Sequence, residues 1–224
     1  LLREIDSVGE AAWAGDITIG TVFFGGGTPS LLEAEEMENI LDRLRKRFAL
    51  APVAEVTVEC NPESLTREKA EGYRLAGVNR LSLGVQSLDD DLLLRLGRLH
   101  SPDEARRAFD AARSAGIDNL SVDLMYGLPG LDRARWELTV SEILAWGPEH
   151  LSAYALTVEE NTRLASNIQR QLSPAPDEGL QIEMDEATQQ MLDDAGYGRY
   201  EVSNYAKSGY ACRHNLLYWT NGEY

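Results

Sequence analysis

The chain reads Thr21-Val22-Phe23-Phe24-Gly25-Gly26-Gly27-Thr28-Pro29, a β-prone run that ends in a glycine triplet. Branched and aromatic residues favour a strand, and consecutive glycines let a ligand approach the backbone closely. The free N–H groups of such a turn suit a carboxylate or a phosphate. We therefore interpret the stretch as a cofactor-binding turn rather than a plain βα connection. It is not a Walker loop, because no Gly-Lys-Ser/Thr follows.

Three further strand-like runs also stop at polar residues, namely Glu59, Gln86 and Asp123. The runs alternate with helical patterns, and the sequence around Gly77 is echoed around Gly116 and, more weakly, around Gly196. Repeated βα units predict parallel strands with helical crossovers. Ligands bind at the carboxyl ends of such strands, so the matched polar residues indicate a cofactor site.

Alternation along each strand gives the predicted sheet two different faces. Residues two apart share a face, so one face is small and polar (Thr57, Glu59, Ser82, Gln86, Ser121, Asp123, Ser152, Tyr154) and the other is apolar (Val56, Val58, Leu81, Leu83, Leu120, Val122). A doubly wound sheet is apolar on both faces, and a closed barrel fills its interior with bulky residues. We therefore expect an α/β fold that forms a wide, incomplete barrel with a polar hollow.

Capping signals mark the predicted helices. Ser30 and Glu33 predict a capping box, and Thr66 predicts a cap for a helix that ends at Gly77. Further helices are expected from Ser101 to Gly116, Trp136 to Ala145 and about Glu178 to Ala195. No linker precedes about residue 165, so we expect one barrel over residues 1–205 and, over 206–224, the start of a connection to a further domain. Both ends read as internal positions of a longer protein.

Composition narrows the classes of partner. The formal net charge of −16 argues against nucleic acid and anionic membranes, both of which attract clustered Lys and Arg. No apolar run approaches the roughly 20 residues that span a membrane, and there is no secretory pattern. Two distant cysteines, Cys60 and Cys212, fit a reducing compartment and cannot form a three- or four-cysteine metal site. We expect a cytoplasmic protein.

Several polar residues have more than one possible role when each is considered alone. Glu59 suits ribose hydroxyls or a salt bridge, and Arg98 suits a ligand carboxylate or a solvated helix end. His214 lies beside aromatic residues and suits a metal or a heme iron, or else a structural hydrogen bond. His100 and His150 are expected to be structural or solvent-facing.

Four segments in this order and spacing carry a resemblance: Gly-Gly-Gly-Thr-Pro, Glu-Cys-Asn-Pro-Glu, Gly-Val-Gln-Ser and Asp-Leu-Met-Tyr-Gly-Leu-Pro-Gly. Nearly the whole chain resembles the radical S-adenosylmethionine proteins of the oxygen-independent coproporphyrinogen III oxidase group. The segments Leu156–Thr162 and His214–Trp219 place it closest to the heme-chaperone branch, the HemW type. The resemblance implies a partial, splayed and open TIM-like α/β barrel (βα units) of the radical SAM type, with its first strand missing because it lies upstream of Leu1.

The resemblance also implies roles for residues. Gly26, Gly27 and Thr28 would hold the methionine end of S-adenosyl-L-methionine, and Glu59 would bind its ribose. Gln86, Arg98, Asp123 and Thr157 match positions that line the cofactor pocket, including a second S-adenosylmethionine in the oxidase branch. His214 matches a histidine associated with heme in the chaperone branch.

The chain departs from the family in one major respect. The family carries a Cys-x3-Cys-x2-Cys loop that ligates a [4Fe-4S] cluster, and this chain has none. Cys60 and Cys212 do not match that loop. We expect the cluster only in the full-length protein, and no radical chemistry in the chain as given.

Three functions remain open at this point. The first is the central part of a heme chaperone that binds heme and delivers it to an apo-hemoprotein, with any membrane contact made only through that recipient. The second is an oxidase that decarboxylates coproporphyrinogen III, a porphyrinogen substrate. The third is a βα-repeat enzyme with another nucleotide ligand.

Overall fold

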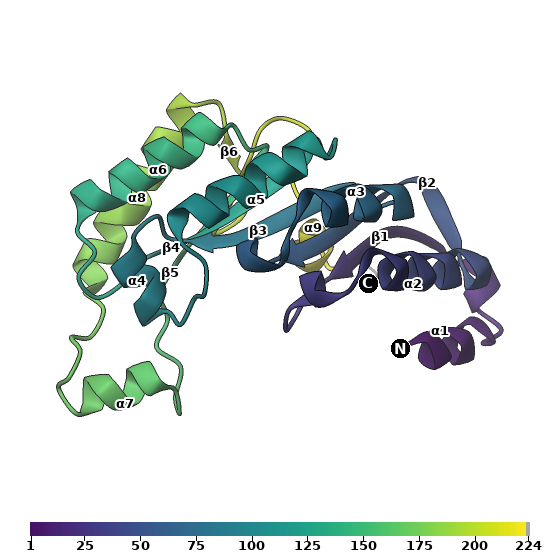
Figure 1. Cartoon of the computed structure of the whole chain (residues 1–224), viewed down its shortest axis with the longest axis horizontal. Helices are drawn as coiled ribbons and strands as arrows, with labels where there is room; N and C mark the ends of the chain where they lie inside the picture. Colours follow the sequence, from purple (N-terminus) through teal and green to yellow (C-terminus); the bar gives the residue numbers. More distant parts are fainter. Residues whose placement is uncertain (223–224) are drawn as a thin grey trace. The chain divides into compact units, whose positions relative to one another are not determined.

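The computed structural model describes residues 1–222 and has the expected α/β organisation (Figure 1). Seven strands form one sheet in the order β1-β2-β3-β4-β5-β7-β6. They are β1 (Thr18–Phe24), β2 (Ala49–Cys60), β3 (Arg80–Gln86), β4 (Asn119–Tyr126), β5 (His150–Ala155), β6 (Gly198–Arg199) and β7 (Asn204–Ala206). β1 pairs with β2 and β2 with β3 in parallel, whereas β7 pairs antiparallel with β5 and β6.

Nine α-helices are described within residues 1–222. They are α1 (Leu2–Gly9), α2 (Ala34–Arg47), α3 (Arg67–Ala76), α4 (Asp90–Arg95), α5 (Pro102–Ser114), α6 (Arg133–Trp146), α7 (Arg163–Gln169), α8 (Glu178–Asp194) and α9 (Arg213–Trp219).

The chain divides into two compact units. The first contains residues 1–84, 103–121 and the C-terminal segment from Cys212; the second contains residues 85–102 and 122–211.

The first unit confirms the predicted division of the sheet into two faces. Val58, Leu81, Leu83 and Leu120 are fully buried on the apolar face, and Met37 and Leu41 of α2 belong to the same core. Helices α2 and α3 pack against each other (Figure 1). The opposite face carries Thr57, Ser82 and Ser121, which are also buried. Buried polar side chains are costly without partners, so this composition sets the face apart from the apolar one.

Helix α3 has the expected caps. The Thr66 hydroxyl accepts a hydrogen bond from the Lys69 N–H at 3.2 Å, and Gly77 ends the helix with a left-handed φ of 110°. Only a residue without a Cβ adopts that conformation at little cost. The predicted helices that end near Gly116, Gly147 and Gly196 are confirmed as α5, α6 and α8.

The capping box predicted at Ser30 is wrong. Residues Pro29–Leu31 form a 3-10 turn, and the Ser30 hydroxyl contacts the Ser64 hydroxyl at 2.6 Å and accepts from the Asn61 N–H at 3.1 Å. Helix α2 begins later, where Glu33 and Glu36 form the capping box. The buried tertiary partner of Ser30 outcompetes the local cap, and the next acid along the chain replaces it.

The weak third copy of the βα repeat is also wrong as a parallel unit. The short strand β6 follows Gly196 as the pattern suggested, but it pairs antiparallel with β7. A tight return of the chain between β6 and β7 leaves no room for a helical crossover, which parallel pairing requires.

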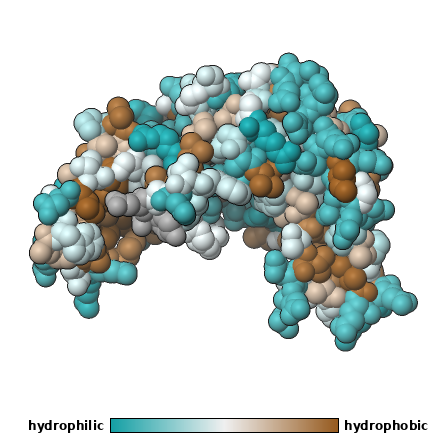
Figure 2. All heavy atoms as spheres, turned by 180° about the vertical axis from the view of Figure 1, so that it is seen from behind, coloured by the Kyte–Doolittle hydropathy of each residue, from teal (hydrophilic) through white to brown (hydrophobic). Residues whose placement is uncertain are grey.

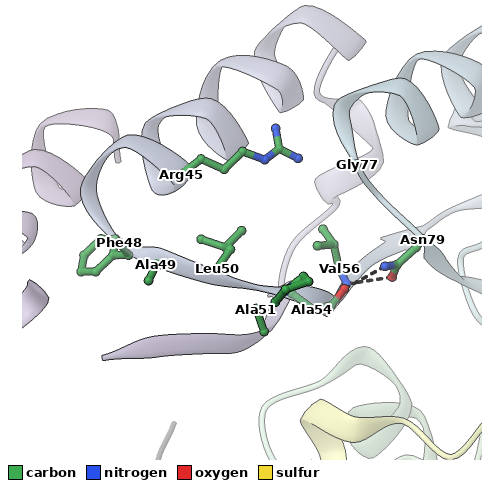
Figure 3. A pocket seen from close by; sticks show the side chains of 10 residues that line it. Arg45, Phe48, Ala49, Leu50, Ala51, Ala54, Val56, Gly77 and Asn79 are labelled. Atoms are coloured by element: carbon green, nitrogen blue, oxygen red, sulfur yellow. Dashed lines mark hydrogen bonds between the residues drawn. The ribbon is translucent and has the colours of Figure 1, made fainter. Parts of the chain in front are cut away.

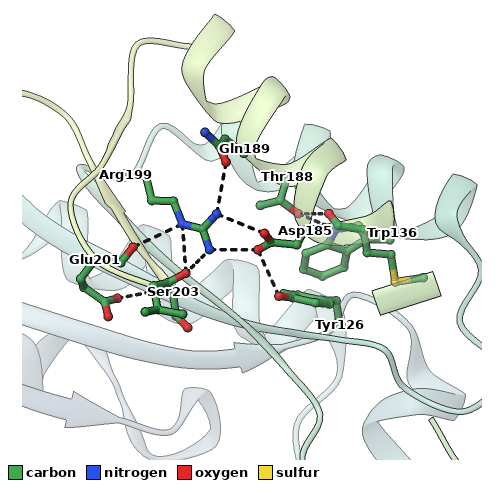
Figure 4. A network of polar contacts seen from close by, with 10 residues as sticks. Tyr126, Trp136, Asp185, Thr188, Gln189, Arg199, Glu201 and Ser203 are labelled. Atoms are coloured by element: carbon green, nitrogen blue, oxygen red, sulfur yellow. Dashed lines mark hydrogen bonds and ion pairs between the residues drawn. The ribbon is translucent and has the colours of Figure 1, made fainter. Parts of the chain in front are cut away.

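In the second unit, α6 and α8 pack through a buried polar contact (Figure 4). The Trp136 indole donates to the Thr188 hydroxyl at 2.7 Å, and Thr188 donates to the Met184 carbonyl at 2.6 Å. Nearby, Asp185 accepts from the Tyr126 hydroxyl at 3.2 Å and pairs with Arg199 at 3.1 Å. Burial, reinforced by Asp185, raises the pKa of Tyr126 and keeps it a donor.

The surface seen in Figure 2 is mostly hydrophilic with apolar patches between, as the acidic composition predicts. Among the helices that the structure describes, none combines the length and the apolar character that crossing a membrane requires.

Candidate functional site

The glycine turn follows β1 directly. Gly26 and Gly27 have left-handed φ angles of 73° and 68°, and a Cβ added at either would meet no atom within 4 Å. The conformation therefore explains the glycines, and the space beside them is open. A turn of this shape leaves room for a ligand beside the backbone, and the cofactor-binding role of the turn stays a prediction.

Glu59 reaches this turn from the end of β2. Its Oε2 accepts a hydrogen bond from the Gly26 N–H at 3.2 Å, although the two residues are 33 positions apart. Thr28 follows the turn and is half-buried. The structure thus brings four predicted residues of the first unit together: Gly26, Gly27, Thr28 and Glu59. A carboxylate beside a glycine turn and open space can accept hydrogen bonds from hydroxyl and amino groups of a ligand.

The predicted residues of the second unit lie on separate segments. Gln86 ends β3, Arg98 follows α4, Asp123 lies in β4 and Thr157 follows β5. Gln86 is buried and has a φ of 65°, which is costly for a residue with a side chain. Its amide oxygen accepts from the Tyr154 hydroxyl at 2.5 Å. Arg98 and Asp123 are half-buried, and Thr157 is exposed.

Tyr154 was not predicted as a site residue. Its strand parity placed it on the polar face, and that was the available signal. The two histidines expected to be structural or solvent-facing are buried: His100 contacts the Val85 carbonyl at 3.1 Å, and His150 contacts the Tyr200 hydroxyl at 2.8 Å.

His214 lies in the first turn of α9 and is half-buried against β1. The Thr21 hydroxyl contacts its Nδ1 at 2.8 Å. The Phe23 ring stacks on the imidazole with centroids 5.0 Å apart and planes 16° apart. On the other side, the Tyr218 hydroxyl is 3.4 Å from Nε2. Burial lowers the pKa of His214, with a smaller opposing effect from Glu55, so the ring favours the neutral form that binds metals.

Glu55 is a site residue that sequence reasoning missed. Its side chain is almost fully buried and accepts from the backbone N–H groups of Arg213 and His214, each at 3.0 Å. The parity of Glu55 along β2 placed it on the polar face with Thr57 and Glu59, but nothing in the sequence identified α9 as its partner.

Two polar atoms beside this group lack partners. Thr57 and Arg80 face each other across β2 and β3, and both are buried. Within residues 1–222, Thr57 Oγ1 and Arg80 Nε have no hydrogen-bond partner. Buried polar atoms of this kind are normally satisfied by ordered water.

A pocket of about 450 Å³ lies elsewhere in the first unit (Figure 3). Its lining includes Phe48, Leu50 and Pro52 near the start of β2, with Arg45 at its edge. The Asn79 side chain closes part of the wall by donating to the Ala54 carbonyl at 2.8 Å. Its residues come from the end of α2, the amino-terminal part of β2 and the connection between α3 and β3, so it is separate from the carboxyl ends of β1 and β2.

No metal-binding cluster is found in the described part of the chain, where no three His, Cys, Asp or Glu side chains are grouped suitably. Cys60 and Cys212, the two cysteines of the chain, are buried and are not joined in a disulfide. The residues present therefore do not fit a [4Fe-4S] cluster, which needs three or four accessible thiolates.

The fold defines an α/β protein of the barrel type, in which a glycine turn and a carboxylate lie together at the carboxyl ends of β1 and β2. Coproporphyrinogen III oxidase (HemN) from Escherichia coli, described as a radical SAM enzyme, has the same fold. It matches with a TM-score of 0.81 at 22% identity, over 98% of this chain and 50% of that one. Archaeal Elp3 from Methanocaldococcus infernus matches with a TM-score of 0.66 over 85% of this chain and 48% of that one, at 21% identity.

The sequence profile of the Radical SAM superfamily matches residues 2–143, and the chain belongs to that superfamily. The expected fold class, the partial α/β barrel of the radical SAM type, is thereby confirmed. Membership implies S-adenosylmethionine and a [4Fe-4S] cluster for proteins of this family.

Curated relatives cover the whole chain. The heme chaperone HemW of Escherichia coli is 43% identical over 227 residues, which cover 100% of this chain and 58% of that protein. HemW of Bacillus subtilis is 37% identical, over 99% of this chain and 59% of that protein. The mouse mitochondrial protein named radical S-adenosyl methionine domain-containing protein 1 is 42% identical, over 92% of this chain and 47% of that protein. The chain spans somewhat more than half the length of these HemW proteins.

Proposed function

We propose that this chain is the central part of a heme chaperone, which binds heme and delivers it to an apo-hemoprotein in the cytoplasm. The observation that carries the proposal is the environment of His214, whose imidazole is oriented on three sides by Thr21, Phe23 and Tyr218. A neutral, half-buried imidazole with one nitrogen already engaged is well suited to binding a heme iron. Similarity to proteins named HemW supports the same reading.

S-adenosylmethionine fits the first unit. The open space beside Gly26 and Gly27 and the Glu59 carboxylate match the amino, carboxylate and hydroxyl groups of that molecule. In this proposal the turn from Gly26 to Thr28 holds the methionine end and Glu59 binds the ribose. Gln86, Arg98, Asp123 and Thr157 are proposed as contacts to the same cofactor from their motif positions alone.

The cluster supplies an iron site for S-adenosylmethionine in this family, and the residues of this chain do not hold it. In this proposal the residues of the chain bind and orient S-adenosylmethionine: the glycine turn makes room for the cofactor, and Glu59 fixes its position. We also propose that the barrel strands end near residue 205 and that the segment after it, which returns to the first unit through α9, leads into a further domain.

The test uses full-length protein and ferric heme. A titration followed by absorbance should show a Soret spectrum that changes in the His214→Ala variant, because the imidazole nitrogen that would bind the iron is lost. Added imidazole should restore the wild-type spectrum. The control is His150→Gln, which removes a histidine bonded to Tyr200 in the other unit. Identical spectra for wild type and His214→Ala would remove His214 as the ligand.

The oxidase is the second candidate. The identity to HemW proteins is 37–43%, against 22% to the oxidase HemN, so sequence similarity favours the chaperone. An anaerobic assay of the full-length protein with coproporphyrinogen III and a reductant decides between them. Formation of protoporphyrinogen would favour the oxidase.

A further inference from the structure

Three donors at the start of α9 converge on one buried carboxylate. Glu55 Oε2 accepts from the Arg213 N–H at 3.0 Å, and Oε1 accepts from the His214 N–H at 3.0 Å and from the Cys212 thiol at 3.5 Å. Only 6% of Glu55 is exposed. A buried carboxylate is costly without partners, and hydrogen bonds from backbone N–H groups to an ionised acceptor are among the stronger ones.

This contact replaces the usual local cap. The first N–H groups of a helix have no partner within the helix. Here the Cys212 sulfur accepts from the Asn215 N–H at 3.5 Å, and Glu55 of β2 takes the two N–H groups before it. The start of α9 is thereby fixed to a strand more than 150 positions away in the sequence.

The residue that holds the α9 backbone and the residue that contacts the His214 ring are neighbours on adjacent strands. Thr21 of β1 is the register partner of Glu55 in β2. Glu55 therefore holds the His214 backbone directly beside the strand position whose hydroxyl contacts His214 Nδ1 at 2.8 Å. With Nδ1 engaged by Thr21, the nitrogen left to a ligand is Nε2, whose contact is the Tyr218 hydroxyl at the longer distance of 3.4 Å.

We propose that Glu55 is a positioning residue for His214: its carboxylate fixes the first turn of α9 on β2, and the imidazole consequently presents Nε2 to the heme iron. The inference rests on the proposed function, in which His214 is the iron ligand. Residues that orient a metal-binding histidine through its backbone or its second nitrogen typically change metal affinity by about 10–100-fold when removed.

The experiment measures ferric heme binding to full-length protein by absorbance, for wild type, His214→Ala, Glu55→Gln and Glu149→Gln. The Glu55→Gln amide keeps the shape but replaces one acceptor oxygen by a donor that opposes an N–H. We expect heme affinity to fall about tenfold or more, the Soret spectrum to approach that of His214→Ala, and added imidazole to restore the wild-type spectrum. Glu149→Gln alters another buried glutamate, in the other unit, and should behave as wild type.

A second pair of variants covers the case in which Glu55→Gln does not fold. Arg213 is the first residue of α9, where proline is tolerated, and Cys212 before it has φ −64° and ψ 111°, which proline also permits. Arg213→Pro deletes the N–H that bonds Glu55, whereas Arg213→Ala keeps it. The difference between the two measures that one hydrogen bond, and we expect Arg213→Pro to show the weaker binding.

The outcomes separate the two claims. A spectrum unchanged in His214→Ala contradicts the proposed iron ligand, and the role of Glu55 falls with it. A spectrum changed in His214→Ala but unchanged in folded Glu55→Gln contradicts Glu55 alone. Where Glu55→Gln does not fold, equal heme affinity and equal spectra for Arg213→Pro and Arg213→Ala contradict the positioning role of Glu55.

Discussion

Replacing Gly27 by alanine tests the open cradle, because the structure separates backbone strain from ligand exclusion. At a φ of 68° the new side chain meets no protein atom within 4 Å, so the cost is conformational alone. A left-handed conformation costs an L residue roughly 1–2 kcal/mol. For a chain of this size that corresponds to a drop of roughly 2–8 °C in the unfolding midpoint.

The matched control is Gly147→Ala. Gly147 ends α6 with a φ of 75°, and a Cβ there also meets nothing within 4 Å. Both variants should therefore lose the same stability. If S-adenosylmethionine occupies the space beside Gly27, only Gly27→Ala should also lose cofactor affinity, by more than about tenfold or 1.4 kcal/mol. The assays are thermal unfolding and calorimetric titration of S-adenosylmethionine into full-length protein. Equal affinity for the two variants would refute the assignment of the turn.

Two further predictions concern stability. Hydrogen bonds from Arg43 and Arg47 lower the pKa of Asp6, so its contribution is present above its unfolded value of about 3.9 and is lost as pH falls through the folded value. Asp6→Asn should lower the unfolding midpoint at pH 7, and the difference from wild type should vanish in acid; a constant difference would contradict the ion pairs. Trp136→Phe should cost roughly 1–3 kcal/mol, because it removes the buried donor to Thr188 and part of a packed ring. Urea unfolding measures it, and a loss below about 0.5 kcal/mol would contradict the importance of that bond.

Much of the fold was predictable because its signals are local. Alternation with a period of two distinguished Val58 from Thr57, and the structure confirms both faces. Glycines at helix ends marked Gly77 and Gly147, where a left-handed φ excludes most other residues. The glycine turn and Glu59 were predicted to lie together because parallel strands end at the same edge, and the Gly26–Glu59 hydrogen bond confirms this.

The errors and omissions have a common cause. Ser30 forms its contacts with Asn61 and Ser64, more than 30 positions away, so the local capping pattern misled. Glu55 accepts hydrogen bonds from residues near 213, and no local sequence pattern at either position predicts this pairing. Local patterns reveal which residues are polar and which face they share. They do not reveal which distant donor satisfies each one.

The polar face of the first unit follows from what packs on it. Helix α9 begins over β1 and β2 with N–H groups that need acceptors, so an apolar residue in place of Glu55 would leave two of them buried and unsatisfied. Next to it, Thr57 and Arg80 keep buried atoms without protein partners within the described residues. The contacts to α9 on this face come instead from Glu55, which accepts from its first N–H groups, and from Thr21 and Phe23, which contact the His214 ring. In our proposal the position of the histidine depends on these contacts, because they hold both its backbone and its ring.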